Sequence, residues 1–160
     1  MRTVWVPEAI LPGGPSIFLA GPTPRSPEVA SWRPEALKAL AEAGFDGTVY
    51  LPEPRSKGVS RSYDEQVGWE TDALTAATCI MFWVPRDLAP DANGYPRMGA
   101  LTTNVEFGAW MKSGKAVLGY PPAAQKMGYL MWHAQREGVP VHHDLASTVQ
   151  EAMNMALRWP

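Results

Sequence analysis

The chain has 160 residues, of which 46% are hydrophobic and 19% charged, a composition that fits one globular domain and argues against disorder. Its net charge of −2 excludes a general electrostatic attraction to nucleic-acid polymers or to anionic membranes. The longest apolar run, residues 79–84, is far too short to span a membrane, and early prolines interrupt any secretory signal. A single cysteine, Cys79, forms no internal disulfide and is typical of a reducing compartment, so we expect a cytoplasmic protein.

From residue 16 onward, short apolar runs alternate with amphipathic segments. In chain order we expect a strand at 16–20, a helix at 34–43, a strand at 48–51, a helix at 63–77, a strand at 79–84, a helix at 104–112, a strand at 116–119, a helix at 123–137, a strand at 139–142 and a helix at 145–159. Strands that alternate with helices pair in parallel through right-handed crossovers. The sequence therefore predicts an α/β protein with a single domain over residues 1–160. Its fold would be a flavodoxin-like, doubly wound sheet of about five mostly parallel strands, preceded by an N-terminal extension at 1–15.

Ligands of such a sheet bind beyond the carboxyl ends of its strands, which directs attention to Glu106, after the loop that follows the third strand. The spacing of Thr103 and Glu106 fits a capping box, in which both side chains satisfy backbone donors at a helix start, and the pattern alone favours that interpretation. Alternatively, Glu106 is a catalytic carboxylate in the first turn of a helix, kept ionised by the helix dipole and able to attack a sugar anomeric carbon. Its position near the ligand crevice favours catalysis, and the two roles are compatible.

Glu70 and Asp72 lie two residues apart on the helix that leads into the third strand. Residues with this spacing point about 200° apart on a helix, so at most one of the two acids faces the crevice. A carboxyl group with a raised pKa can protonate a departing base, whereas acids on a solvated helix face carry no chemistry. We expect one of the two to be the proton donor.

Arg25 and Arg86 lie shortly after the first and third strands, where each can anchor a phosphate or a sugar hydroxyl, although many such arginines are only surface residues. His142, His143 and Asp144 look like a metal-binding set, but neighbours on a strand project to opposite faces and no further ligand has metal spacing. We therefore expect no metal site and no cofactor.

Six segments occur in a specific order: Ile17-Phe-Leu-Ala-Gly-Pro22, Ser31-Trp-Arg33, Trp69-Glu70, Phe82-Trp-Val-Pro-Arg86, Thr102-Thr-Asn-Val-Glu-Phe-Gly108 and Ser113-Gly-Lys115. Together they resemble the nucleoside 2-deoxyribosyltransferase-like family, from about residue 16 to the fourth strand. The resemblance implies a flavodoxin-like fold and an enzyme that cleaves or exchanges the N-glycosidic bond of deoxynucleosides through a covalent glycosyl-glutamate. Relatives that hydrolyse nucleoside 5′-monophosphates share that glutamate. Family members are commonly homo-oligomers, so the resemblance implies one here.

By position, the resemblance makes Glu106 the nucleophile and Glu70 the acid that handles the departing base. Better-studied members carry an aspartate in the second role, which keeps Asp72 as the alternative. The residues expected to bind substrate are Gly21, Pro22, Thr23, Arg25, Arg86, Thr102, Thr103 and Asn104. Of these, residues 21–23 match the family's sugar and base contacts, and residues 102–103 match positions near the 5′ group.

The sequence leaves three functions open, all of them with a small nucleoside or nucleotide as the ligand. The one that we favour is transfer of the sugar to another base, as by a nucleoside 2-deoxyribosyltransferase. The second is hydrolysis, as by a nucleoside 5′-monophosphate N-glycosidase, which differs only in what reaches the intermediate. The third is a non-catalytic nucleotide-binding module, because a fold alone does not establish activity.

Overall fold

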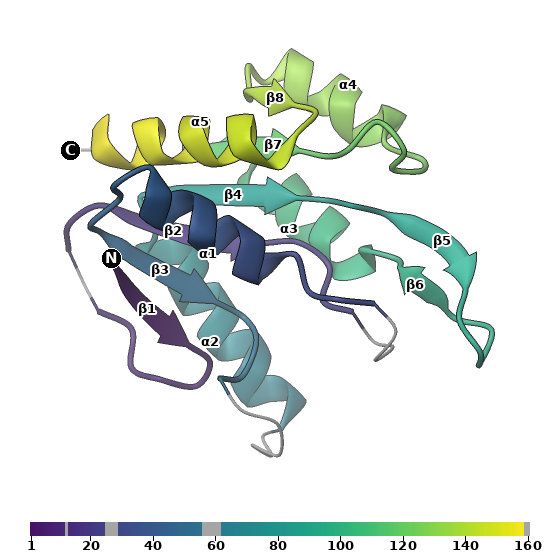
Figure 1. The fold of residues 1–160 in the computed structure, drawn as a ribbon, viewed down its shortest axis with the longest axis horizontal. Helices are drawn as coiled ribbons and strands as arrows, with labels where there is room; N and C mark the ends of the chain where they lie inside the picture. Colours follow the sequence, from purple (N-terminus) through teal and green to yellow (C-terminus); the bar gives the residue numbers. More distant parts are fainter. Residues whose placement is uncertain (12, 25–28, 56–61, 159–160) are drawn as a thin grey trace.

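The computed structural model describes residues 1–11, 13–24, 29–55 and 62–158 (Figure 1). The strands are β1 (Arg2–Trp5), β2 (Ser16–Ala20), β3 (Thr48–Leu51), β4 (Cys79–Trp83), β5 (Asp87–Pro90), β6 (Pro96–Met98), β7 (Ala116–Gly119) and β8 (Val141–His142). The helices are α1 (Arg33–Glu42), α2 (Tyr63–Ala76), α3 (Leu101–Trp110), α4 (Gly128–Arg136) and α5 (Leu145–Arg158). The strands expected from the sequence correspond to β2, β3, β4, β7 and β8, and the expected helices to α1 through α5.

Six strands form the main sheet in the order β1-β3-β2-β4-β7-β8, and every pairing in it is parallel. Without β1 this is the flavodoxin order, in which the chain begins in the middle of the sheet and winds outward to both sides. The winding direction reverses between β2 and β4, so the carboxyl ends of these strands flank the place where such folds bind ligands. The predicted flavodoxin-like architecture is confirmed, with six strands instead of about five.

The extra strand, β1, lies within the extension expected at 1–15 and pairs with β3 at the edge of the sheet. Its four residues end shortly before Pro7, which is too short a run to show a strand period. Pairing with the neighbouring segment fixes it instead, beginning with the backbone N–H of Arg2, which donates to the Gly47 carbonyl at 2.9 Å. The loop expected at 85–103 likewise contains a two-stranded antiparallel hairpin, β5–β6, which projects from the body of the molecule (Figure 1).

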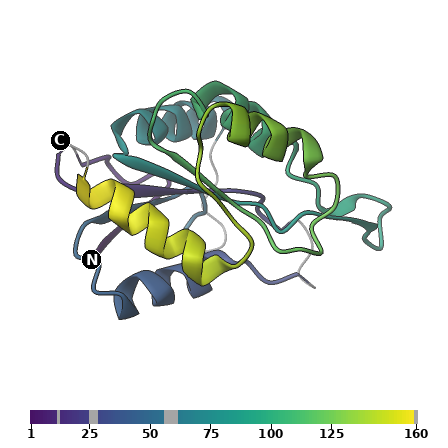
Figure 2. The same ribbon diagram turned by 90° about the horizontal axis from the view of Figure 1, so that it is seen from above.

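Helices cover both faces of the sheet: α1 and α5 lie on one face, and α2, α3 and α4 on the other (Figure 2). Alternate strand residues enter two buried clusters, Phe18, Ile80 and Leu118 on the side of α2, α3 and α4, and Ile17, Met81 and Val117 on the side of α1 and α5. Strands buried on both faces need apolar residues at nearly every position, which is why β2 and β4 are recognisable in the sequence.

Cys79, the only cysteine of the chain, begins β4 and is fully buried. Burial raises the pKa of its thiol well above the usual range, because the interior disfavours the charged thiolate. The thiol therefore stays protonated and unreactive in the folded protein.

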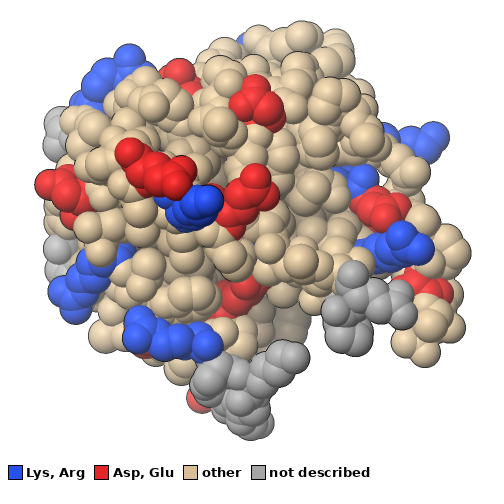
Figure 3. Space-filling model, in the orientation of Figure 1, with Lys and Arg blue, Asp and Glu red and all other residues tan. Residues whose placement is uncertain are grey.

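Acidic and basic side chains are interspersed over the face seen in Figure 3, without a continuous basic area. Within the described part of the chain, no helix combines the length and apolar character that crossing a membrane requires.

Candidate active site

Arg33, the first residue of α1, lies buried at the carboxyl ends of β2 and β3, with only 1% of its surface exposed. Its guanidinium donates to the Leu19 carbonyl at 3.1 Å, to the Gly21 carbonyl at 2.8 Å and to the Thr23 hydroxyl at 3.0 Å. It also forms an ion pair with Glu53, the second residue after β3. Neighbouring parallel strands end at the same edge, and Arg33 joins the segments that follow two of them.

The ion pair between Arg33 and Glu53 is nearly excluded from solvent, since the Glu53 side chain is 15% exposed. Ser31 donates its hydroxyl to the same carboxylate at 2.9 Å. Burial lowers the pKa of Arg33, and the negative charge of Glu53 opposes that shift. Sequence reasoning missed both residues. The available signal was Arg33 in the family-like segment Ser31-Trp-Arg33 and a carboxylate directly beyond a buried strand.

Glu106 is the sixth residue of α3 and is partly buried. Its pKa is raised to about 7: burial is the largest cause, the negative charge of Glu70 also raises it, and the positive charge of Arg33 lowers it. Glu70 belongs to α2, Arg33 to α1 and Glu106 to α3. The pKa of Glu106 therefore depends on charged side chains from two other helices. The structure thereby brings Glu70 and Glu106, both predicted from the sequence, to the same site.

The capping-box interpretation of Thr103 and Glu106 is wrong. The helix α3 begins at Leu101 after Ala100, which has a left-handed backbone (φ 58°) and makes no side-chain cap. Thr103 is buried, and Glu106 lies beyond the first turn, where the helix dipole contributes little. The expectation that the dipole keeps Glu106 ionised is therefore also wrong, because burial and Glu70 raise its pKa. The helix starts three residues earlier than expected, shortly after the hairpin β5–β6 ends at Met98.

Glu70 and Asp72 differ in their surroundings, although both lie on α2. Glu70 is partly buried and accepts a hydrogen bond from the Gln66 amide at 2.8 Å, whereas Asp72 is exposed. The negative charge of Glu70 raises the pKa of both Glu106 and Arg33. The structure thus places Glu70, and not Asp72, beside Glu106.

Residues 21–23 lie beside Arg33. The indole N–H of Trp32 donates to the Pro22 carbonyl at 3.1 Å. Gly21 has a positive φ of 147°, and a Cβ there would collide with the backbone carbonyl of Trp83, so the turn accepts only glycine. Arg25, expected in the same loop, lies outside the described residues.

Arg86 and Asn104 meet on the other side of α3. The guanidinium of Arg86, which is 6% exposed, donates to the Asn104 side-chain oxygen. Asn104 and Glu106 are two residues apart and therefore point about 200° apart around the helix. Thr102, at the start of α3, is exposed. The structure brings Arg86 and Asn104 together, but away from the side of α3 that carries Glu106.

The segment from His142 to Asp144 has structural contacts. The His143 ring packs edge-on against Tyr120 at a centroid distance of 4.7 Å, and Asp144 accepts a hydrogen bond from the Ser147 N–H at 2.7 Å near the start of α5. Among the described residues, no group of three or more histidine, cysteine or acidic side chains is arranged to hold a metal ion.

A comparison with protein-family models matches residues 14–124 to the family described as nucleoside 2-deoxyribosyltransferase like. The matched region runs from just before β2 to the loop before α4 and contains Arg33, Glu53, Glu70 and Glu106. A comparison with curated proteins finds no match. Because the matched region covers well over half of the 160 residues, the chain belongs to the nucleoside 2-deoxyribosyltransferase-like family.

Proposed function

We propose that the protein cleaves the N-glycosidic bond of a deoxynucleoside or nucleoside monophosphate through a covalent glycosyl ester on Glu106, and then transfers the sugar to a second base. One observation carries this proposal: the partly buried carboxyl of Glu106, with a pKa of about 7, lies close enough to Glu70 and Arg33 for their charges to act on it. Family membership supports a nucleoside-related substrate.

In the first step, a carboxylate oxygen of Glu106 bonds to C1′ of the sugar as the bond between C1′ and the base nitrogen breaks. The electron pair of that bond goes to the base, which takes a proton from Glu70 or from a water molecule that Glu70 positions. In the second step, a nitrogen of the incoming base attacks C1′ and frees the Glu106 carboxylate. The proton of the incoming base returns to the group that gave one up in the first step, either Glu70 or the hydroxide left from that water. Two displacements at C1′ give overall retention of configuration.

The charge environment suits both steps. The negative charge of Glu70 raises the pKa of Glu106, and an ionised Glu70 can position the water molecule that protonates the departing base. Incomplete solvation makes an ionised Glu106 more basic and leaves its charge free to stabilise the positive charge that develops at C1′. The positive charge of Arg33 favours the ionised form of Glu106, because it lowers the pKa of that carboxyl.

The segment at residues 21–23 has a binding role in this proposal. Arg33 holds the Gly21 carbonyl and the Thr23 hydroxyl in place, and Glu53 in turn holds Arg33. A loop fixed by a buried ion pair presents its backbone rigidly, which favours precise contacts with a sugar and base.

The test is a chromatographic assay of base release from a panel of nucleosides and nucleoside 5′-monophosphates, with and without an added acceptor base. Glu106→Gln should abolish release, because it removes the nucleophile and keeps the shape of the side chain. Asp72→Asn, which neutralises an exposed acid on α2, should leave release unchanged. Near wild-type release by Glu106→Gln overturns the mechanism. Release that needs no acceptor base identifies a hydrolase, and binding without turnover identifies a nucleotide-binding module.

A further inference from the structure

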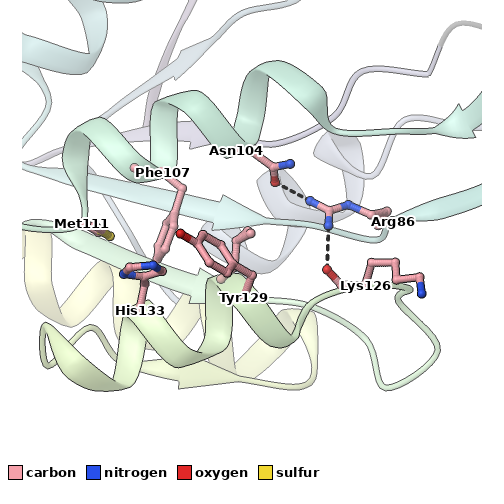
Figure 4. Close-up of a pocket in the computed structure, with 9 residues that line it drawn as sticks. Arg86, Asn104, Phe107, Met111, Lys126, Tyr129 and His133 are labelled. Carbon is pink, nitrogen blue, oxygen red and sulfur yellow. Dashed lines mark hydrogen bonds between the residues drawn. The ribbon is translucent and has the colours of Figure 1, made fainter.

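A pocket lies between α3 and α4 (Figure 4). Its volume is about 550 Å³, within the range of small-molecule sites. Asn104, Gly108 and Met111 contribute to its lining from α3. These residues recur at three- and four-residue spacing, so they share one stripe of the helix. Glu106 is two residues from both Asn104 and Gly108, so it points away from that stripe, about 200° around the helix from Asn104. The pocket and the Glu106 site therefore occupy different sides of α3.

A buried cation lies at one end of this pocket. Arg86 donates to the Lys126 carbonyl at 3.0 Å and to the Asn104 side-chain oxygen, and both of these partners are uncharged groups. Its Nε is buried and has no hydrogen-bond partner among the described residues. No carboxylate of the residues that the structure describes forms an ion pair with Arg86. A buried charge without a counter-ion is costly, and an anion in the pocket would compensate it.

Lys126 adds a second positive charge at the same end. Its backbone is left-handed, with a φ of 54°, a conformation that is uncommon for a residue with a Cβ. In that conformation the Lys126 carbonyl accepts from Arg86, and the Lys126 side chain extends away from the guanidinium (Figure 4). The exposed ammonium group takes part in no ion pair within the described residues. The buried Arg86 makes this end of the pocket a site for an anionic group, and the exposed Lys126 adds positive charge at its rim.

The rest of the pocket is apolar and aromatic. Phe107 and Leu130 are buried, and Tyr129 is 76% exposed. The Tyr129 ring contacts the His133 ring edge-on at a centroid distance of 4.6 Å. Figure 4 shows the Phe107, Tyr129 and His133 rings grouped on the side of the pocket away from Arg86. Aromatic walls of this kind favour a planar ring, which can stack on or pack edge-on against them.

We propose that this pocket binds a small aromatic anion, a planar ring that carries one carboxylate or phosphate group. The anionic group lies on Arg86, with Lys126 at the rim, and the ring lies among Phe107, Tyr129 and Leu130. This ligand is separate from the substrate of the Glu106 site, so its binding does not depend on the function proposed above.

The experiment is a titration of the full chain, isotope-labelled for NMR, with phenyl phosphate, benzoate, inorganic phosphate and the neutral benzyl alcohol. We expect phenyl phosphate or benzoate to shift the Arg86 Nε–H resonance and to bind about tenfold or more tightly than benzyl alcohol. The stronger of the two aromatic anions identifies the preferred charged group. Equal affinity for benzyl alcohol, or no shift with either aromatic anion, overturns the proposal.

Two variants test the location of the site. Arg86→Met should weaken binding of the aromatic anion by about tenfold or more. Gly108→Leu keeps the proposal testable if Arg86→Met fails to fold. Gly108 lines the pocket and a Cβ there meets no atom within 4 Å, so a leucine side chain begins in open space, occupies part of the pocket and should abolish binding. Gly68→Leu is the matched control, because Gly68 has the same open surroundings on α2 and does not line the pocket.

The catalytic variant separates this inference from the proposed function. Glu106→Gln should bind the aromatic anion with unchanged affinity, whether or not the protein releases bases. Loss of binding in Glu106→Gln would place the probe at the Glu106 site and overturn the proposal. Pocket resonances that shift with protein concentration in the absence of probe would show that a second copy of the chain fills the pocket, which also overturns it.

Discussion

The carboxyl groups of Glu70 and Glu106 stand on different helices, α2 and α3, and the charge of Glu70 raises the pKa of Glu106. Packing of the two helices on the same face of the sheet brings the acids together, although they are far apart in the sequence. The buried guanidinium of Arg33, from α1, interacts electrostatically with both carboxylates. The ionisation of Glu106 therefore depends on side chains of α1 and α2 as well as on its own position in α3.

The first prediction concerns the pH dependence of base release. If Glu106 is the nucleophile, kcat/KM should rise with pH through a midpoint of about 7, because only the ionised carboxyl attacks. Glu70→Gln should move this midpoint to lower pH, since it removes the charge that raises the pKa of Glu106. Rate profiles of the wild type and the variant from about pH 5 to about pH 9 measure the shift. Asp72→Asn should leave the midpoint in place, and an unchanged midpoint in Glu70→Gln contradicts the assignment.

The second prediction concerns stability. The pKa of Glu106 is about 7 in the folded protein and 4.5 as an ordinary glutamate, so the folded state holds its proton more tightly. Raising the pH between these values first ionises the unfolded chain and therefore lowers the free energy of unfolding. Glu106→Gln should then be more stable than the wild type by about 2 kcal/mol above about pH 7, and nearly equal to it at about pH 4. Urea unfolding at the two pH values measures the difference, and a gap of the same size at both would contradict the raised pKa.

The third prediction concerns the ion pair of Arg33 and Glu53. Arg33→Met should lower the free energy of unfolding by about 3 to 5 kcal/mol, because it leaves the Glu53 carboxylate poorly solvated and without its cation. Adding Glu53→Gln to this variant should recover part of the loss. Lys38→Met is the control, since Lys38 forms only an exposed pair with Glu42 and its replacement should change stability by about 0.5 kcal/mol or less. A loss for Arg33→Met no larger than that of the control would show that the pair contributes little.

The fourth prediction concerns Lys115, which is 7% exposed and caps the end of α2. Its ammonium donates to the carbonyls of Leu74, Thr75 and Ala77 at 2.8, 2.9 and 2.8 Å. Lys115→Met should cost about 2 kcal/mol, because three carbonyls at a helix terminus lose a charged donor. Thermal unfolding measures the loss, with Lys112→Met as the exposed control. Equal midpoints for the two variants would rule out this capping role.

The sequence predicts the central elements well because their signals are local. The strands β2 and β4 are apolar throughout and end abruptly, as strands covered on both faces do. The strand β1 and the hairpin β5–β6 are missed because they are short edge elements, with a proline at Pro90 and at Pro96 in the hairpin. Their pairing is a tertiary effect that no local periodicity contains.

The residues of the candidate site differ in the same way: some are recognisable from local sequence, and the surroundings of others depend on tertiary structure. Glu106 and Glu70 are recognisable from family-like segments, but the neighbours that set the pKa of Glu106 come from distant parts of the chain. Arg33 would be expected at the surface from its position at the first turn of a helix. Its burial depends on the Gly21 carbonyl and on Glu53, which approach only when β2 and β3 pair. Charge burial of this kind follows from the assembled fold.

The position of Cys79 has a practical consequence. The thiol lies at the start of the central strand β4, is fully buried and has a raised pKa, so alkylating reagents reach it only when the sheet opens. Because it is the only thiol of the chain, its labelling rate reports one event without a background from other sites. The protein thus carries its own probe of opening, against which the stability of each variant can be compared without an added label.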